Sequence, residues 1–341
     1  MKSIEWINDV EVLKIGTQVI KRGERKRVFL ESAAMYDSTQ LSIPVEVIRG
    51  KERGPILFIS AAIHGDEING VEIIRRLLKK PLTKRIHGTL ILIPIVNIFG
   101  FNYKSRYLPD RRDLNRSFPG NKNGSLASRM AYIFMKEVVS KCTHGIDLHT
   151  ASGHRTNLPQ VRACLEDKET EALARSFKVP VLINSKLRDG SLREAARKKN
   201  VKMLLYEGGQ ALRFEEDVIK IGLKGCISVM KSIGMIPNTK IPAPNTKVFI
   251  AKSSSWGRAP ISGTSCSKRK IGDKVKKGDL LAVISDPFGE KEVEVRADIE
   301  GILIGVSLLP LVNKGDALYH IATFSHTPRV KQALSIYDNL L

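Results

Sequence analysis

The sequence predicts an α/β domain, with a mixed or largely parallel sheet flanked by helices, followed by a smaller all-β domain. Short apolar segments of strand length alternate with segments of helical periodicity between residues 43 and 233. A stretch rich in proline and asparagine predicts a linker at 237–247. Beyond it, short strands between glycines replace the helical pattern. The predicted domains are residues 1–236 and 248–326, which agrees with about two domains for 341 residues.

The first domain is expected to begin with edge strands in residues 1–40 and then to alternate strands with helices. Ser125 is placed to cap a helix, and Pro81 to end one. Residues 97–124 form a long polar loop, and a loop of that length inside a compact domain is usually functional. The expected strands are 43–48, 56–62, 89–96, 145–148, 180–183 and 201–207, and the expected helices are 71–80, 126–141, 167–177, 191–200 and 214–233.

The second domain contains an internal repeat. Residues 275–281 (Val-Lys-Lys-Gly-Asp-Leu-Leu) match residues 312–318 (Val-Asn-Lys-Gly-Asp-Ala-Leu), and both copies run into a strand. The glycine of each copy provides the backbone freedom that a tight turn requires. Two similar halves of this kind resemble the biotinyl/lipoyl type of barrel-sandwich, which is the fold expected for residues 248–326.

The chain carries a large excess of positive charge. Lysine and arginine number 56 against 35 aspartate and glutamate residues, so the formal net charge is +21. Such a field attracts anions, and the candidates are nucleic acid, an acidic membrane surface or a small acidic substrate. The basic residues are spread along the chain, aromatic residues make up only 6%, and neither an RNP-like aromatic motif nor a helix-turn-helix pattern occurs. A nucleic-acid partner is therefore not expected.

Composition also indicates where the protein is expected to act. No apolar run reaches the roughly 18 residues of a membrane-spanning helix, so no membrane partner is expected. The first residues include three acids and lack the apolar core of a signal peptide. The four cysteines are scattered without a CxxC pair, as in a reduced protein. These features predict a cytoplasmic protein and leave open whether it is a homo-oligomer.

The strongest local signal follows the apolar strand predicted at 56–62. His64 and Glu67 stand three residues apart at its carboxyl end, where an imidazole and a carboxylate can converge on one cation. A further imidazole, His149, directly follows the strand predicted at 145–148. Two histidines and one glutamate make a Zn²⁺ site with one position left for water, as in catalytic zinc hydrolases. The sequence therefore predicts one Zn²⁺ ion per chain, held by these three residues.

Two other segments carry polar side chains suited to catalysis. The long loop contains Arg106 and the cluster Asp-Leu-Asn-Arg-Ser-Phe-Pro-Gly at 113–120. Arginine can hold a carboxylate through two hydrogen bonds, which lysine cannot do. Glu207 ends the strand predicted at 201–207 and precedes two glycines, which makes it a candidate general base. An ordinary acid at a strand end is the alternative for Glu207.

Taken in order, these motifs resemble the succinylglutamate desuccinylase/aspartoacylase family of the zinc carboxypeptidase superfamily. The resemblance covers about residues 30–235, and the C-terminal β domain also looks like that of the family. It implies a zinc-carboxypeptidase-like mixed sheet flanked by helices. The matching motifs are His64-x-x-Glu67, Arg106, DLNRSFPG at 113–120, DLHT at 147–150 and YEGG at 206–209.

The resemblance implies a role for each residue of the predicted metal site. His64, Glu67 and His149 would bind the zinc ion. Glu207 would take a proton from the attacking water and later protonate the leaving amine. Asp113 would orient a zinc-binding histidine, as carboxylates commonly do around metal sites.

The long loop would supply the groups that hold the substrate. Arg106 would polarise the scissile carbonyl and stabilise its oxyanion. Asn115 and Arg116 would grip the substrate carboxylate. This chain has extra residues after Arg106 compared with the aspartoacylases, including Arg111 and Arg112. The sequence therefore does not decide which of the three arginines faces the oxyanion. It also does not decide whether this chain shares the narrow substrate specificity of the aspartoacylases.

The predicted function is zinc-dependent hydrolysis of the amide bond of an N-acyl amino acid, or of a similar small carboxylate-bearing amide. The expected partner is a small acidic N-acylated substrate whose acyl group and amino acid the sequence does not name. A metallocarboxypeptidase acting on peptides is the alternative within the superfamily, and a β domain that caps the mouth of the site would exclude long peptides. The alternative of another class is a non-enzymatic basic carrier or nucleic-acid-binding protein.

Overall fold

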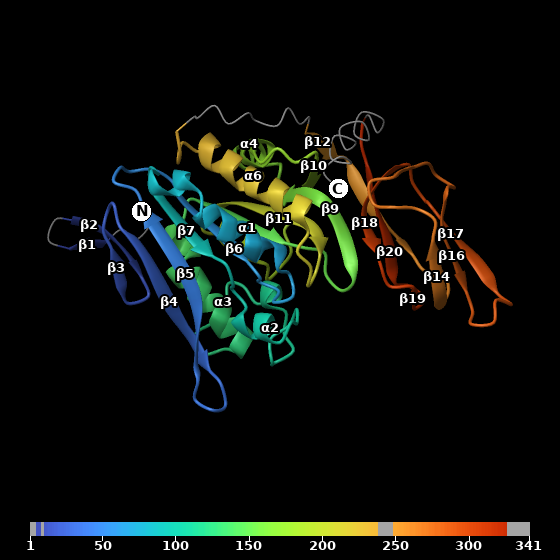
Figure 1. Cartoon of the computed structure of the whole chain (residues 1–341), viewed down its shortest axis with the longest axis horizontal. Helices are drawn as coiled ribbons and strands as arrows, with labels where there is room; N and C mark the ends of the chain where they lie inside the picture. The colour runs from blue at the N-terminus through green and yellow to red at the C-terminus, as the bar shows by residue number, and fades with distance from the viewer. Residues whose placement is uncertain (1–4, 8–9, 238–247, 326–341) are drawn as a thin grey trace.

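The structure is a computed structural model that describes residues 5–7, 10–237 and 248–325 (Figure 1). These residues form a mixed α/β fold in which helices cover both faces of a large mixed sheet. The strands of the C-terminal part extend this sheet at one end of the molecule, and the N-terminal strands lie at the other end. The predicted α/β class is confirmed.

The large sheet combines strands from both parts of the chain. The α/β part contributes β4 (Arg25–Ala34), β5 (Gln40–Arg49), β6 (Ile56–Ala61), β7 (Thr89–Ile93), β8 (His144–His149), β9 (Arg155–Ala163), β10 (Val181–Asn184) and β11 (Lys202–Gln210). The C-terminal part contributes β12 (Phe249–Ala251), β13 (Ser253–Arg258), β15 (Lys274–Val275), β18 (Gly301–Ser307) and β20 (Ala317–Thr323). Within the described residues, the order is β13-β20-β18-β9-β11-β8-β6-β7-β5-β4, with β10, β12 and β15 attached beside this path.

The strands at the centre of the sheet pair in parallel. Strand β6 pairs with β7 and β8, and β8 pairs with β11. Their carboxyl ends meet at one edge of the sheet, where ligands of α/β proteins commonly bind. All of β7 is buried, as are five of six residues in both β6 and β8. Burial on both faces explains why these segments are apolar throughout instead of alternating.

Helices pack on the two faces of the sheet, with α1, α4 and α6 on one face and α2 and α3 on the other (Figure 1). Their bounds are α1 (Asn69–Leu78), α2 (Ile98–Asn102), α3 (Leu126–Glu137), α4 (Lys168–Ser176), α5 (Leu192–Arg197) and α6 (Glu216–Ser232), with short 3-10 turns at Pro81–Lys84, Leu114–Arg116 and Val139–Lys141. Ser125 begins α3 and accepts a hydrogen bond from the N–H of Ser128, as a helix cap should. No helix among the described residues is both long and apolar enough to cross a membrane.

The sequence-based prediction misses one central strand, β9. Its residues are largely polar, and Pro159 within it ordinarily argues against a central strand. In the structure, residues 155–157 pair with β18 and residues 160–163 pair with β10. Pro159 lies between these two ladders, so its missing N–H interrupts neither of them.

The C-terminal part also forms a second, antiparallel sheet. Its strands are β14 (Gly263–Ser267), β16 (Leu280–Ser285), β17 (Glu292–Arg296) and β19 (Leu311–Val312), in the order β17-β16-β14-β19. Leu281 of this sheet shares a hydrophobic core with Leu303 of β18 and Ile321 of β20. Two sheets around one core agree with a sandwich, while the closer likeness to a biotinyl/lipoyl domain stays a prediction.

Both copies of the internal repeat form the same turn. Gly278 and Gly315 have φ angles of +90° and +91°, a conformation that glycine adopts without strain. In each copy the aspartate after the glycine accepts a hydrogen bond from the main-chain N–H three residues earlier, at 3.0 Å for Asp279 and 2.8 Å for Asp316. The matching sequences therefore have matching local geometry.

The boundary between the predicted domains stays a prediction. Apart from residue 237, the predicted linker at 237–247 lies outside the described residues. The C-terminal strands are joined to the α/β part through the large sheet, since β12 pairs with β10 and β18 pairs with β9. At the other end of the molecule, β1 (Glu5–Ile7), β2 (Val10–Ile15) and β3 (Gln18–Ile20) form a small antiparallel sheet.

Candidate active site

The candidate site lies at the carboxyl edge of the parallel strands. His64 follows β6, His149 ends β8, and Glu207 lies on the adjacent strand β11. His149 and Glu207 are register partners, so the two residues lie side by side in the sheet. Gly65 packs the loop after β6 against α2, where an added Cβ atom would lie 1.8 Å from the carbonyl carbon of Gly100. The loop that carries His64 therefore requires glycine directly after this histidine.

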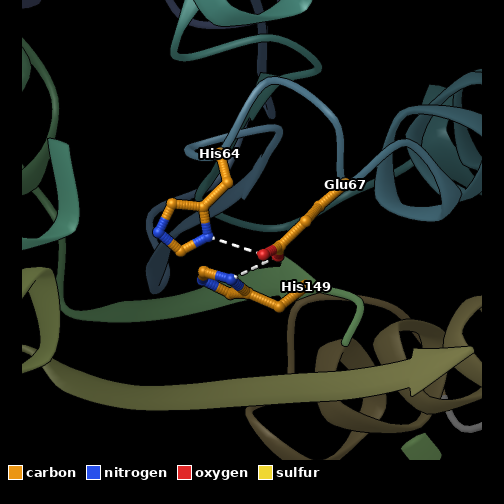
Figure 2. Close-up of side chains that lie close together, drawn as sticks. All are labelled: His64, Glu67 and His149. Atoms are coloured by element: carbon orange, nitrogen blue, oxygen red, sulfur yellow. Dashed lines mark hydrogen bonds and ion pairs between the residues drawn. The ribbon is translucent and has the colours of Figure 1, made fainter. Parts of the chain in front are cut away.

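The side chains of His64, Glu67 and His149 converge on one point (Figure 2). The Glu67 carboxylate lies between the imidazoles, with Oε1 2.7 Å from Nδ1 of His64 and Oε2 2.7 Å from Nδ1 of His149. All three residues are buried, and one ligand atom from each lies within 4.8 Å of the others. Two nitrogens and one carboxylate at this separation match the protein ligands of a catalytic Zn²⁺ site.

A carboxylate orients each imidazole through its other nitrogen. Nε2 of His64 lies 3.1 Å from Oδ1 of Asp113, and Nε2 of His149 lies 2.7 Å from Oδ2 of Asp147. The Ser60 hydroxyl donates to the other oxygen of Asp147 at 2.7 Å. Such carboxylates fix the orientation and tautomer of a metal-binding histidine. The role that the resemblance implies for Asp113 stays a prediction, and its carboxylate is the one beside His64. The sequence reasoning misses Asp147, although its spacing of two residues along the strand places it on the same face as His149.

Electrostatic pairing within this group outweighs the cost of burial. Burial opposes ionisation of Glu67, but the imidazoles of His64 and His149 hold the pKa of this carboxyl well below its ordinary value. Burial also opposes a charged His149, yet Asp147 and Glu67 raise its pKa well above the ordinary value. The group thus favours positive charge at its centre, either as protons on the imidazoles or as a divalent cation that replaces them.

Arg106 lies against the same group. Its Nη1 lies 3.1 Å from Oε1 of Glu67, and its Nη2 lies 2.9 Å from Oδ2 of Asp113. Arg106 lines the cavity beside the site, whereas Arg111 and Arg112 are exposed and lie outside it. Of the three arginines left open by the sequence, Arg106 is the one that borders the candidate metal ligands.

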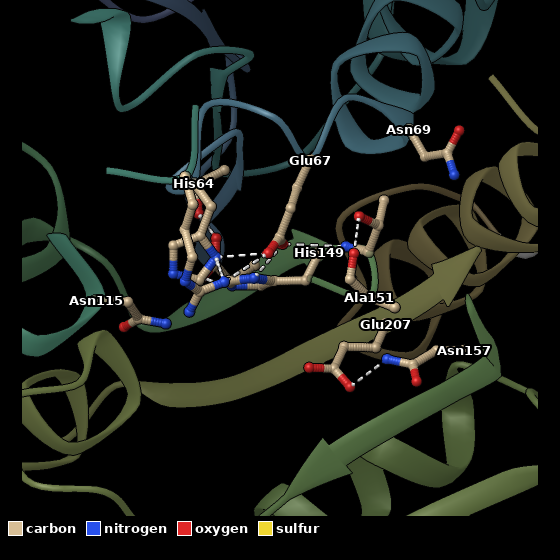
Figure 3. Close-up of polar contacts among 12 residues, drawn as sticks. His64, Glu67, Asn69, Asn115, His149, Ala151, Asn157 and Glu207 are labelled. Carbon is tan, nitrogen blue, oxygen red and sulfur yellow. Dashed lines mark hydrogen bonds and ion pairs between the residues drawn. The ribbon is translucent and has the colours of Figure 1, made fainter. Parts of the chain in front are cut away.

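Glu207 lines the same cavity on the strand next to His149 (Figure 3). Its Oε2 accepts hydrogen bonds from Asn157 at 3.1 Å and Gln160 at 3.4 Å, and it pairs with Nε of Arg162 at 2.8 Å. All three donors belong to β9, the strand that the sequence does not predict. The described residues form no hydrogen bond with Oε1, which leaves this oxygen available to a water or substrate proton.

Asn115 and Arg116 lie on the 3-10 turn of the long loop, and both line the cavity. The side-chain oxygen of Asn115 accepts a hydrogen bond from the N–H of Leu192 at 2.9 Å. This bond fixes the amide and leaves its nitrogen as a donor. The Arg116 guanidinium is exposed and donates to the carbonyl oxygen of Asn115. The turn therefore presents neighbouring donors that suit a carboxylate.

These residues line one cavity of about 370 Å³ whose charge is strongly uneven. Seven arginines and one lysine line it, against the three carboxylates of Glu67, Asp147 and Glu207. The sequence reasoning misses most of these cations, because 56 basic residues spread along the chain single out none of them. The missed cations are Arg155, Arg162, Lys186, Arg188, Arg193 and Arg258.

Arg193 is the most buried of the missed cations, at 8% exposed. Its Nη2 donates to the hydroxyl of Ser185 and to the carbonyl of Lys186, while its Nη1 has no hydrogen-bond partner among the described residues. Burial lowers the pKa of the Arg193 guanidinium to about 10. A buried guanidinium with an unpaired nitrogen favours an anion in the cavity.

The sequence and the fold match a known class of hydrolases. Residues 53–233 match the succinylglutamate desuccinylase/aspartoacylase catalytic domain, and the chain therefore belongs to this family, as its motifs predicted. Among curated proteins, it is 26% identical over 293 residues to N-alpha-acetyl-L-2,4-diaminobutyric acid deacetylase of Halomonas elongata. The match covers 82% of this chain and 85% of that protein.

Solved structures of this family have the same fold. The succinylglutamate desuccinylase/aspartoacylase of Rhodobacter sphaeroides aligns with a TM-score of 0.79 at 22% identity, over 88% of this chain and 96% of that one. The ectoine utilization protein EutE (DoeB) of Ruegeria pomeroyi, solved with its product bound, also aligns with a TM-score of 0.79. Its identity is 25%, over 88% of this chain and 95% of that one. Each alignment covers more of this chain than the 181 residues that match the catalytic domain.

Proposed function

We propose that this protein is a zinc-dependent amidohydrolase that cleaves the amide bond of an N-acyl amino acid or of a similar small carboxylate-bearing amide. The observation that carries the proposal is the convergence of His64, Glu67 and His149 beside a cavity with an excess of arginines. Membership of the family supports it, and so does the name of the Halomonas relative, which describes the removal of an acetyl group from an amino acid.

The residues present fit one Zn²⁺ ion per chain. His64, Glu67 and His149 would hold it, because two imidazoles and a carboxylate are the donors of catalytic zinc sites that keep a position for water. Asp113 and Asp147 already orient the two imidazoles through their outer nitrogens. When bound, zinc supplies a Lewis acid that activates water and polarises a carbonyl.

The chain's own side chains account for proton transfer and charge stabilisation. Glu207, with one oxygen held by β9 and the other available, would take a proton from the attacking water and deliver it to the leaving amine. Arg106 would donate to the oxyanion that develops on the scissile carbonyl. Its guanidinium is already held by Glu67 and Asp113, so little reorganisation is needed when that charge appears.

The substrate carboxylate would lie against the 3-10 turn of the long loop. Asn115 offers its side-chain nitrogen there, and the exposed Arg116 guanidinium has no carboxylate partner among the described residues. Two donors on one turn can hold a carboxylate at two points, which positions the amide relative to the metal ligands.

The volume and the lining of the cavity support a small substrate over a peptide. Trp256, Arg258 and Ala317 belong to strands of the C-terminal part, and they form part of the lining. A cavity of about 370 Å³ bordered in this way suits a small molecule. A carboxypeptidase would need an open groove for the residues that precede the scissile bond. We treat residues 1–236 as the catalytic domain. Residues 248–326 then form a second domain whose strands border the cavity.

Metal analysis and a substrate panel test the proposal. Purified protein is expected to hold about one zinc ion per chain. A chelator should abolish hydrolysis of N-acetyl and N-succinyl amino acids, and added Zn²⁺ should restore it. Faster hydrolysis of short peptides would favour the carboxypeptidase alternative. Salt-sensitive binding of nucleic acid without any hydrolysis would favour the non-enzymatic alternative.

A further inference from the structure

Strand β4 is the last strand of the large sheet, at the end away from the C-terminal strands (Figure 1). Within the described residues it pairs with β5 on one side and with no strand on the other. Its register with β5 is regular from Arg25 to Glu31, and a bulge interrupts it only after Glu31. A regular edge strand presents main-chain groups to which a strand of another chain can bond. The open side of β4 is therefore a candidate interaction surface.

The main-chain groups of the odd-numbered residues of β4 face this open side. Just before the strand, the N–H of Arg49 donates to the carbonyl oxygen of Glu24 at 2.9 Å, so an even-numbered residue bonds to the β5 side. Opposite Phe29 lies Pro44, which has no N–H to donate. Bonded and non-bonded pairs alternate along antiparallel strands, so residues 25, 27, 29 and 31 point their N–H and C=O groups outward. No main-chain group in the described part of the chain bonds to them there.

The side chains of the same odd-numbered residues are exposed on one face of the sheet. Arg27, Phe29 and Glu31 lie in a row there, while Val28 and Leu30 between them are buried. Phe29 is 62% exposed, and Glu31 forms no ion pair within the described residues. A cavity of about 440 Å³ borders the edge beside residues 29–32, with α3 on its other side. The edge therefore has both exposed side chains and free space next to it.

The exposed row is complementary to itself. When two copies of β4 pair antiparallel about a two-fold axis at Phe29, the two Phe29 rings face each other, and Arg27 of each copy faces Glu31 of the other. Opposite charges and aromatic pairs at facing positions stabilise a sheet. The same pairing about Arg27 or Glu31 would place like charges opposite each other. Phe29 also has the outward N–H and C=O groups that a central pair requires, so sequence and backbone select the same register.

We propose that β4 is a dimerisation strand, through which two copies of this chain join their large sheets into one continuous sheet. The contact is isologous, with a Phe29 pair on the two-fold axis and an Arg27–Glu31 ion pair on each side of it. The complementarity is with the strand itself, which identifies the partner as a second copy and not as an unrelated protein. No residue of β4 lines the candidate active site, so the dimer leaves that cavity unchanged. The inference does not rest on the proposed function.

The first test measures the mass of the full chain in solution. A single pair of edge strands buries a limited surface, so the dissociation constant is expected to be roughly micromolar. Sedimentation velocity between about 1 and 100 μM should show the mass rising from one chain to two, since dimerisation depends on concentration. A monomer over this whole range overturns the inference.

Charge reversal then tests the register. Glu31→Arg and Arg27→Glu each place like charges at two equivalent positions, so each variant alone should dissociate at least about tenfold more readily than the wild type. An equimolar mixture of the two variants has opposite charges at both positions and should form a heterodimer with an affinity within about threefold of the wild type. Glu292→Arg, an exposed residue of β17, is the matched control and should dimerise as the wild type does. Unchanged affinity in both variants, or no recovery in a mixture of folded variants, overturns the inference.

Arg27 also pairs with Glu46 of its own chain, at 2.8 Å, so Arg27→Glu can disturb the fold. A cross-link avoids this difficulty. Phe29→Cys, with Cys164 and Cys266 changed to serine, places two thiols at the two-fold axis. Their Cα atoms would lie about 5.5 Å apart, which a disulfide can span.

Mild oxidation of the Phe29→Cys protein should give a covalent dimer, seen on a non-reducing gel. Arg25→Cys in the same background is the matched control. Position 25 would face position 33 of the other copy, so its two thiols would lie about 27 Å apart and should not join. A covalent dimer with both variants, or with neither, overturns the inference. None of these measurements involves hydrolysis, so their outcome is separate from that of the proposed function.

Discussion

The two ends of the cavity hold charge in opposite ways. At the inner end, His64, Glu67, Asp147 and His149 are buried, and Asp113 and Arg106 are half-buried beside them. Each of these carboxylates lies within hydrogen-bond distance of an imidazole or guanidinium. At the outer end, Arg155 and Arg258 are held by carbonyl oxygens and a tryptophan ring, without a carboxylate among the described residues. The inner end is therefore arranged to bind a cation at its centre. The outer end is arranged to bind an anion.

This difference follows from the cost of burying charge. A buried unpaired charge costs several kcal/mol, roughly, so the inner residues must pair to be stable in the folded state. The half-buried Arg155 and the exposed Arg258 carry no such requirement, so they can keep a net charge for a ligand. The inner end is therefore suited to the chemistry and the outer end to the choice of substrate. Changes at the inner end should alter metal binding and turnover, while changes at the outer end should alter selectivity.

Removal of the Glu67 carboxylate, at the centre of the candidate metal site, should have the largest effect on zinc binding and hydrolysis. Glu67→Gln keeps the size of the side chain but removes the charge that both imidazoles face, so bound zinc should be lost. Hydrolysis should fall by at least about ten-thousandfold with it. Elemental analysis and kcat/KM measure the two losses. Glu169→Gln, an exposed acid on α4, is the control. A zinc-free Glu67→Gln protein that retained wild-type activity would contradict the site.

Glu207→Gln should separate turnover from metal binding. Because Glu207 is not among the candidate ligands, the zinc content should stay at the wild-type value. The amide of glutamine cannot accept and return a proton, so kcat should fall by about a hundredfold to a thousandfold. Elemental analysis and steady-state kinetics on one protein preparation give both values. Full turnover in this variant would refute the assignment of Glu207 as the base.

Asp147→Asn should weaken zinc binding without removing it. Asn keeps the shape of Asp147 but loses the charge that orients His149 through its outer nitrogen, so zinc affinity should fall by about tenfold to a hundredfold. Competition with a chromophoric chelator measures this affinity, and kcat at saturating zinc should change less. Ser60→Ala, which removes only a hydroxyl donor to Asp147, should have a smaller effect. Wild-type affinity in Asp147→Asn would show that this carboxylate does not orient the ligand.

The smallest predicted effect concerns His320, which stacks on Trp256, the ring beneath Arg155. The residue is 3% exposed, and burial, with a smaller effect from Arg162, lowers its pKa from 6.5 to about 3. The folded state therefore binds this proton less readily than the unfolded chain. The neutral ring contributes its full stability above pH 6.5 and loses it as the pH falls toward 3.

His320→Phe should remove this part of the pH dependence while keeping an aromatic ring against Trp256. Between about pH 5.5 and pH 4, the free energy of unfolding of the wild type should fall by up to about 1.4 kcal/mol per pH unit more than that of the variant. Urea unfolding at several pH values measures both slopes. Parallel slopes would show that His320 is not held neutral in the folded state.

The sequence predicts the strands whose burial is uniform and misses β9, the strand that holds the Glu207 carboxylate. Strand β6 is apolar because both of its faces are covered, and the run at 56–62 indicates it directly. Strand β9 is buried too, but Asn157, Gln160 and Arg162 within it hold the Glu207 carboxylate. Polar residues chosen for that contact break the hydrophobic pattern from which strands are recognised. Sequences depart from the local pattern of their fold mainly at functional sites, so a missed strand is expected there.

The same division holds within the candidate site. His64, Glu67 and His149 follow predicted strands, so short motifs at strand ends were enough to select them as one group. No such motif marks Arg155 or Arg258, two of the arginines that line the cavity. Arg155 and Arg258 are 103 positions apart in a chain with 56 basic residues, and they come together only because β9, β18, β20 and β13 are neighbours in one sheet.

By itself, the sequence determined the α/β class, the family and the three side chains of the candidate metal centre. Each of these follows from local periodicity or from a motif a few residues long. Only the tertiary structure decided which charges are paired and which are left over, which oxygen of Glu207 is available, and that strands of the C-terminal part border the cavity. The physical reason is that charge pairing depends on distances of a few ångströms between residues far apart in the chain, and these distances exist only once the sheet has formed.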